Sequence, residues 1–107
     1  MSEAAKLPAV MVILALHRPS VQLARRQIES LVAQRGVDLS CVAILDGNET
    51  ADDAELRQIL AGPRIAVLAH REALGVRGAF AAGLRHGMAI AGNDECFFAY
   101  CDQDDVW

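Results

Sequence analysis

The sequence of 107 residues lacks several features that mark specialised classes of protein. It has no excess of basic residues, because 14 Asp and Glu against 10 Lys and Arg give a formal net charge of -4. We therefore do not expect a nucleic-acid partner, since phosphate binding requires clustered Lys and Arg in excess. The sequence also lacks the charge excess and low complexity of a disordered chain, with 53% hydrophobic and 22% charged residues. This composition is that of an ordinary globular protein.

The cysteines are few and have no metal-ligand spacing. Cys41, Cys96 and Cys101 are an odd number, so we expect free buried thiols of low reactivity in a reducing compartment. The sequence thus predicts a cytoplasmic protein, either free or peripheral at the inner face of the membrane.

The apolar run near the N-terminus is too short to cross a bilayer. The run LPAVMVILAL, at residues 7–16, spans only ten residues, is rich in β-branched residues, and has no convincing small-residue cleavage site. We expect a buried strand here and no transmembrane segment.

What the sequence does contain is an alternation of four short apolar runs with three helical patterns. The expected strands are residues 9–16, 39–46, 64–69 and 96–101. Continuous apolar runs are typical of parallel strands whose two faces are both covered by helices. With no internal repeat and no linker, residues 1–107 form one expected domain. The sequence predicts an α/β fold, Rossmann-like, with three αβα layers and a mostly parallel sheet in the order 3-2-1-4.

Each helical pattern has an expected buried stripe. The first helix, opened by Pro19 and Ser20 and closed by Gly36, is expected to turn inward Ala24, Ile28, Leu31 and Val32. The second, begun by a capping-box variant of Thr50 and Asp53, is expected to turn inward Leu56, Ile59 and Leu60. The third carries Phe80, Leu84 and Met88 at intervals of four, and its glycines at 78, 83 and 87 indicate close packing against a neighbour.

Carboxylates gather where the second and fourth strands end. In a sheet of order 3-2-1-4 the ligand crevice lies between the first and fourth strands, and both Asp46 and the cluster from Asp102 to Asp105 open onto it. Crowded carboxylates repel one another unless a cation lies among them. Hard oxygen ligands at a strand end are typical of Mg²⁺ or Mn²⁺ sites. A solvated acidic turn is the simpler alternative, but the preceding buried strand and the following apolar pair Val106 and Trp107 favour a site.

The segment CDQDDVW, at residues 101–107, resembles the DQDD(I/V)W signature of family 2 glycosyltransferases, particularly their rhamnosyltransferase-like members. Four weaker likenesses accompany it. VMVILALHRPS resembles the family's first strand and base-contacting loop, followed by QIESLVAQ as its first helix. VAILDGNETAD resembles the DDGSTD element, with Leu45 in place of its first Asp, and ALGVRGAFAAGL is similar to the segment that usually holds Asn, Gly and a basic residue. The resemblance covers roughly residues 8–107.

The resemblance implies a GT-A fold and metal-dependent, inverting transfer from a nucleotide-diphosphate sugar, with rhamnosyl transfer in polysaccharide synthesis as one form. Asp46 matches the acid that contacts the nucleobase. Asp102 and Asp104 match the DxD pair, with Asp104 as the direct ligand of Mg²⁺ or Mn²⁺ and Asp102 nearer the ribose. Arg77 or Arg71 is left to supply a cation to the diphosphate.

The remaining positions support the site or depart from the family's pattern. Asp105 is expected to shape the loop or reach the sugar, and Trp107 to pack under the loop or line the donor pocket. His17 and Arg18 stand where the family often has Tyr and Asn, and Gly78 and Ala79 replace a basic residue and Asn. We assign no role to the other two histidines, at positions 70 and 86.

The family's domain continues beyond this motif with an acceptor half and a general base. We therefore expect this chain to be the donor-binding part, inactive alone, with its glycan or lipid-linked acceptor bound by the missing half. The apolar strand at residues 96–101 would form an open sheet edge in such a fragment, which predicts pairing of two copies or poor solubility.

Three alternatives remain at this point. A sugar-nucleotide pyrophosphorylase shares the architecture, but it usually has a glycine-rich loop after the first strand, where this sequence has HRPS. A HAD-type phosphatase needs a carboxylate at the end of the first strand, which here reads LALHRP. A non-catalytic nucleotide-binding or interaction module that keeps the fold is the third.

Overall fold

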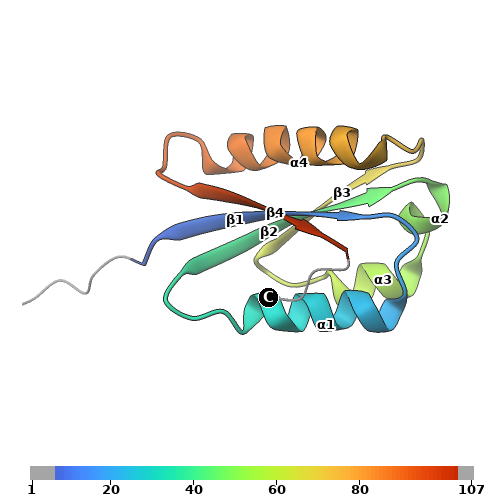
Figure 1. Cartoon of the computed structure of the whole chain (residues 1–107), viewed down its shortest axis with the longest axis horizontal. Coiled ribbons are helices and arrows are strands. Elements are labelled where there is room, and N and C mark those ends of the chain that lie inside the picture. The colour runs from blue at the N-terminus through green and yellow to red at the C-terminus, as the bar shows by residue number, and fades with distance from the viewer. Residues whose placement is uncertain (1–6, 104–107) are drawn as a thin grey trace, which may run out of the picture.

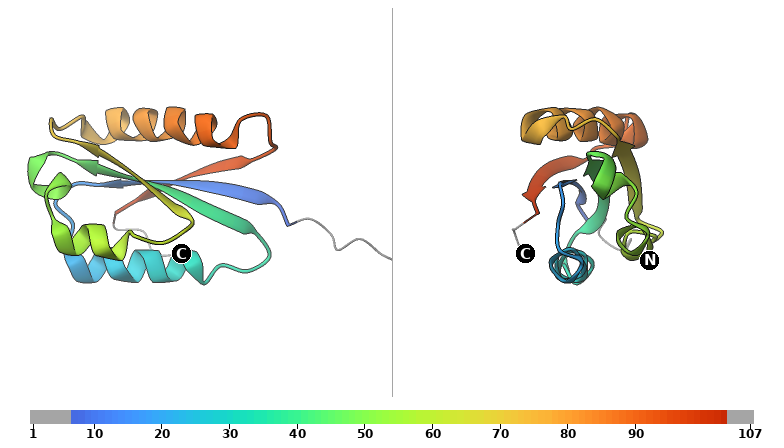
Figure 2. Two further views of the ribbon diagram at one scale, coloured as in Figure 1. Left: turned by 180° about the vertical axis from the view of Figure 1, so that it is seen from behind. Right: turned by 90° about the vertical axis from the view of Figure 1, so that its right-hand side faces the viewer.

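A computed structural model describes residues 7–103 as a parallel sheet between two layers of helices. Along the chain the elements are β1 (Ala9–Leu16), α1 (Val21–Val32), β2 (Asp38–Asp46), α2 (Asn48–Ala51), α3 (Ala54–Ile59), β3 (Ile65–His70), α4 (Gly75–Ala91) and β4 (Phe97–Asp102). The strands lie in the order β3-β2-β1-β4, and every pair is parallel. Helix α4 covers one face of the sheet, and α1 and α3 cover the other (Figures 1 and 2). The predicted α/β fold and strand order are confirmed.

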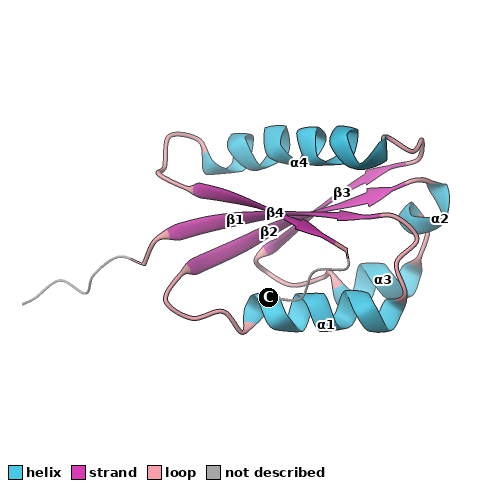
Figure 3. Cartoon of the chain, viewed as in Figure 1, coloured by secondary structure: helices cyan, strands magenta, loops and turns pink. Residues whose placement is uncertain are grey.

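Strands β1 and β2 lie in the middle of the sheet (Figure 3) and hold most of the buried hydrophobic residues. The last six residues of each are buried, as the continuous apolar runs predict. Successive side chains of a strand point to opposite faces, so each strand contributes to two clusters. Residues Val12, Leu14, Leu16, Cys41, Ala43 and Leu45 pack toward α1 and α3. Residues Met11, Ile13, Ala15, Val42 and Ile44 pack toward α4 with Ala79.

Helix α1 begins and packs largely as its sequence predicts. The Ser20 hydroxyl accepts a hydrogen bond from the Leu23 amide at 3.1 Å, which caps the first turn. Ala24, Gln27, Ile28 and Leu31 are buried. The prediction for Val32 is wrong: it is exposed, because it lies about 100° around the helix from Leu31. Gln27 takes the fourth inward position instead.

The expected second helix is split into α2 and α3. Asp53 caps α3, since its carboxylate accepts the Leu56 amide at 2.9 Å. Thr50 does not start this helix. It lies within α2 and is buried, and its hydroxyl accepts the Arg18 amide at 2.7 Å. The predicted capping box is therefore wrong, because Thr50 binds the loop after β1 and Asp53 alone serves as the cap.

Helix α4 turns its small residues to the sheet. Its buried residues are Ala79, Ala82, Gly83 and Gly87, whereas Met88 is exposed and Phe80 and Leu84 are half-buried. The predicted inward stripe is therefore wrong, and the predicted close packing of the glycines is right for two of them. A Cβ at Gly83 would lie 2.5 Å from Cγ2 of Ile13, so only glycine allows this approach.

The remaining expectations concern the cysteines and the membrane. The three cysteines form no disulfide; Cys41 and Cys101 are buried as expected, but Cys96, expected to be buried, is half-buried. Within residues 7–103 no helix has the length and apolar character needed to span a bilayer.

Candidate functional site

The ends of β1, β2 and β4 surround a cavity of about 330 Å³. Asp46 is the last residue of β2 and Asp102 is the last residue of β4, and β1 lies between these strands. Both aspartates line the cavity, together with the end of β1, the start of α4, and Gln103. The structure thus brings Asp46 and Asp102 to one place at the carboxyl edge of the sheet, as the strand order predicts.

Asp46 anchors the beginning of α4. Its side chain is nearly buried, with 4% exposure, and one oxygen accepts the Leu74 amide at 2.7 Å while the other accepts the Gly75 amide at 3.1 Å. Leu74 itself offers no capping side chain, so the carboxylate from β2 satisfies amides that the helix leaves open and meets the positive end of its dipole. Asp46, which the resemblance predicts to contact a nucleobase, therefore also has a structural role: its carboxylate caps the start of α4. This role was not predicted from the sequence.

The loop after β1 is held from three sides. The His17 amide donates to Oε1 of Gln103 at 2.7 Å, and its ring Nδ1 lies 2.9 Å from the Asp46 carbonyl oxygen. The Arg18 amide donates to the Thr50 hydroxyl, and Arg18 has a left-handed φ of 47°. A left-handed non-glycine residue is uncommon and persists where surrounding contacts determine it. These contacts fix the loop at the mouth of the cavity.

A buried glutamine on α1 holds the end of β4. Gln27 is fully buried, and its Nε2 donates to the Asp102 carbonyl oxygen at 2.7 Å. The exposed Asp102 side chain accepts the Gln103 amide at 2.8 Å. The sequence reasoning missed Gln27, although a polar residue three positions after Ala24, on the inward face of α1, was the signal that could have found it. Gln103 and Thr50 were missed because their partners are distant along the chain.

The basic residues near the site differ from those expected. Arg77 is exposed and is not among the described residues that line the cavity. A neighbouring hollow of about 270 Å³, which shares His17, Asp46 and Ala73 with the first, is lined by Arg18 and Arg71. Arg71 pairs with Asp52 at 2.7 Å and Arg18 pairs with Glu49 at 3.2 Å. The arginines beside the site are therefore Arg18 and Arg71.

The predicted metal ligands are only partly visible. Asp104, Asp105 and Trp107 lie outside the described residues. Within residues 7–103 no three His, Cys, Asp or Glu side chains form a group able to hold a metal ion. Mg²⁺ usually takes one or two carboxylates and completes its shell with water and phosphate oxygens. Of the two expected ligands the structure describes only Asp102, whose exposed carboxylate is a donor of the kind that Mg²⁺ and Mn²⁺ prefer.

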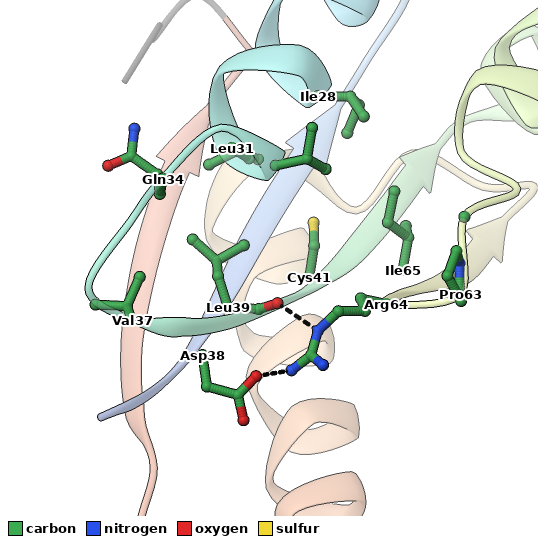
Figure 4. Close-up of a pocket in the computed structure, with 12 residues that line it drawn as sticks. Ile28, Leu31, Gln34, Val37, Asp38, Leu39, Cys41, Pro63, Arg64 and Ile65 are labelled. Atoms are coloured by element: carbon green, nitrogen blue, oxygen red, sulfur yellow. Dashed lines mark hydrogen bonds and ion pairs between the residues drawn. The ribbon is translucent and has the colours of Figure 1, made fainter. Parts of the chain in front are cut away.

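A second cavity, of about 360 Å³, lies at the opposite end of the sheet (Figure 4). Its walls are largely apolar, and its charged pair is already engaged: the Arg64 guanidinium bonds Asp38, and its Nε donates to the Leu39 carbonyl oxygen at 2.8 Å. Burial raises the pKa of the Cys41 thiol in this wall to about 12, and the nearby Cys101 contributes. A thiol with this pKa is protonated at neutral pH, so nucleophilic chemistry is not expected here.

The site occupies the usual ligand position of open α/β sheets, outside the carboxyl ends of the strands. Comparison of the chain with protein-family models and with curated proteins finds no match. Because this type of fold supports many activities, the function has to be inferred from the residues of the site itself.

Proposed function

We propose that the chain is the donor-binding part of a family 2 glycosyltransferase, which transfers a sugar from a nucleotide-diphosphate sugar to an acceptor. The observation that carries the proposal is that Asp46 and Asp102, from two strands separated by β1, line one cavity at the carboxyl edge. The segment CDQDDVW supports it from the sequence, because it has Asp102 as the last residue of β4 and Asp104 two positions further along the sequence.

In this proposal the nucleotide lies across the end of β1. The fixed loop of His17 and Arg18 adjoins its base and ribose, and Asp46 holds the start of α4 beside them. Arg18 and Arg71 line the adjoining hollow and can exchange their carboxylate partners for phosphate oxygens. Arg71 therefore replaces Arg77 as the residue proposed to bind the diphosphate.

Asp102 and Asp104 are the residues that would hold Mg²⁺ or Mn²⁺. When bound, the ion neutralises charge that develops on the departing nucleotide diphosphate. The chain's own contribution is to fix the backbone at Asp102, through the hydrogen bond from Gln27 to the Asp102 carbonyl oxygen. Binding of the glycan or lipid-linked acceptor, deprotonation of its hydroxyl, inversion at the anomeric carbon and a role in polysaccharide synthesis belong to the same proposal.

Calorimetry with UDP, dTDP and GDP, each with and without Mn²⁺, tests the proposal. We expect at least one nucleotide to bind in a metal-dependent manner, and Asp104→Ala or Asp102→Ala to weaken that binding at least about tenfold, since each removes a charged ligand. Asp94→Ala, at the opposite end of β4, is the matched control and leaves affinity unchanged. Absence of binding under all conditions would leave the non-catalytic module that keeps the fold.

A further inference from the structure

His17 lies between the two hollows at the carboxyl edge of the sheet. It lines both the cavity of about 330 Å³ and the neighbouring hollow of about 270 Å³. It is the first residue after β1 and is exposed, so a bound molecule can reach it. A ligand that spans both hollows therefore passes His17.

Three contacts hold His17 in place. Its backbone amide donates to Oε1 of Gln103 at 2.7 Å, and its ring Nδ1 lies 2.9 Å from the Asp46 carbonyl oxygen. The ring also lies close to Gly47, where an added Cβ would be 3.5 Å from both Cε1 and Nδ1. A side chain that is already fixed loses little conformational entropy when a ligand binds to it.

The bond to Asp46 determines which ring nitrogen of His17 carries the proton. A backbone carbonyl oxygen can only accept a hydrogen bond, so Nδ1 is the donor. The neutral imidazole has a single ring N–H, and Nε2 therefore has a lone pair that can accept a hydrogen bond. Within residues 7–103 no group donates to this nitrogen. The structure thus leaves Nε2 of His17 as a fixed acceptor.

The other acceptors among the side chains that line the cavity are engaged. Asp46 is only 4% exposed, and its two carboxylate oxygens accept backbone amides at the start of α4. Oε1 of Gln103 accepts the His17 amide, and the Asp102 carboxylate accepts the Gln103 amide and is proposed to hold the metal ion. Nε2 of His17 is therefore the acceptor that an N–H group of a ligand can meet in this cavity.

We propose that Nε2 of His17 accepts a hydrogen bond from the ring N–H of the donor's nucleobase, so that His17 selects uracil, thymine or guanine over cytosine and adenine. Uracil and thymine carry this N–H at N3, and guanine carries it at N1. The corresponding ring nitrogens of cytosine and adenine have no proton and would oppose their lone pair to that of Nε2. The inference rests on the proposed glycosyltransferase function, and it gives His17 the contact that the resemblance predicts for Asp46.

Calorimetry with the whole chain and Mn²⁺ at pH 8 tests the inference. The probes are UDP, dTDP, GDP, CDP and ADP, followed by the tightest binder with a methyl group on the ring nitrogen in question. We expect UDP, dTDP or GDP to bind most tightly. Its methylated form is expected to bind at least about tenfold more weakly, because it has lost the donor and leaves Nε2 without a partner. Tightest binding of CDP or ADP would overturn the inference.

Two variants assign the methyl effect to His17. In His17→Ala the methyl group is expected to change the affinity less than about twofold, because the group that it opposes is gone. Binding to this variant is expected to stay dependent on Mn²⁺, since the metal ligands are unchanged. The matched control is His86→Ala, which removes a histidine of α4 that is not among the described residues lining either hollow. This control is expected to keep the tenfold difference.

Ring ¹⁵N NMR of His17 adds a measurement that needs no nucleotide. We expect the neutral ring in the free chain to carry its proton on Nδ1, and a proton on Nε2 would overturn the inference while leaving the proposed function standing. Metal-dependent binding with equal affinity for the methylated nucleotide, or a methyl effect that persists in His17→Ala, would do the same. Failure of every nucleotide to bind would refute the proposed function and this inference with it.

Discussion

At the scale of single residues, the side chains beneath the site bind backbone groups of distant segments. Asp46 holds the start of α4, Gln27 holds the end of β4, and Thr50 holds the loop after β1. The sequence identified Asp46 as a site residue from its place at a strand end. Its hydrogen bonds were not predictable, because they require the start of α4 to fold back over β2.

Replacement of Asp46 tests whether its carboxylate stabilises the start of α4. In Asp46→Ala the Leu74 and Gly75 amides lose their acceptor, so we expect the free energy of unfolding to fall by about 1 to 2 kcal/mol, as for loss of a helix cap. Asp46→Asn keeps one acceptor oxygen, so its free energy of unfolding is expected to fall less. Urea denaturation measures both. The matched control Asp52→Ala breaks only an exposed ion pair and is expected to stay within about 0.5 kcal/mol of the wild type. An unchanged urea midpoint for Asp46→Ala would contradict this capping role.

The cysteines differ in their expected reactivity. Cys41 and Cys101 are buried, and burial raises the pKa of Cys41 to about 12, whereas Cys96 is half-buried. We expect a thiol reagent at pH 8 to modify Cys96 in the folded chain and to reach the other two only in denaturant. The unfolded Cys41 thiol ionises near its ordinary pKa of about 8.5. The stability that the buried, protonated Cys41 thiol contributes to the folded chain is therefore fully present below about pH 8.5, and it is lost as the pH rises toward about 12.

The variant Cys96→Ser provides the control for this experiment. It retains only the two buried thiols, so the folded variant is expected to show no rapid modification. Rapid modification of one or two thiols in folded Cys96→Ser would show that the core opens or is packed differently.

At the scale of elements, the sequence predicted strands better than helix faces. A continuous apolar run reads as a buried strand whichever face each residue takes, so β1 was predicted with its observed bounds and the other three within one residue. A helix face depends on its neighbour. In α4 the larger apolar residues suggested one face, but the closeness of Ile13 and Ile44 selects the glycine face instead.

Substitution of Gly83 tests the close packing of α4. Alanine favours a helix by about 1 kcal/mol over glycine. At Gly83, however, its Cβ would lie 2.5 Å from Cγ2 of Ile13 and overlap Cδ1 of Ile44, and overpacking of this kind costs about 1 to 3 kcal/mol. We therefore expect Gly83→Ala to lower the thermal midpoint.

Gly87→Ala is the comparison on the same face of the helix. Its Cβ would meet its nearest neighbours at 3.2 to 3.3 Å, so small shifts accommodate it and the midpoint is expected to change less than in Gly83→Ala. A Gly83→Ala variant more stable than the wild type would show that α4 does not approach the sheet this closely.

At the scale of the whole molecule, the strand order determines where a ligand can bind. Alternating strand and helix patterns predict a parallel sheet with helical crossovers of one hand, and the expected order 3-2-1-4 is one of the orders that such a sheet can take. From that order followed the meeting of Asp46 with Asp102. The choice of arginine was not predictable, because Arg71 and Arg77 both follow β3 closely and only the path of the connection places Arg71 at the adjoining hollow.

Paramagnetic broadening by Mn²⁺ in amide NMR spectra locates the proposed site most directly. With Mn²⁺ and the best-binding nucleotide diphosphate, we expect loss of the amide signals of Ala15, His17 and Gln103, which line the cavity at the carboxyl edge. Signals of Arg64 and Asp94, at the other end of the sheet, are expected to persist. Broadening centred on Arg64 or Asp94, or broadening that is the same without the nucleotide, would contradict a shared site for metal and donor at the carboxyl edge.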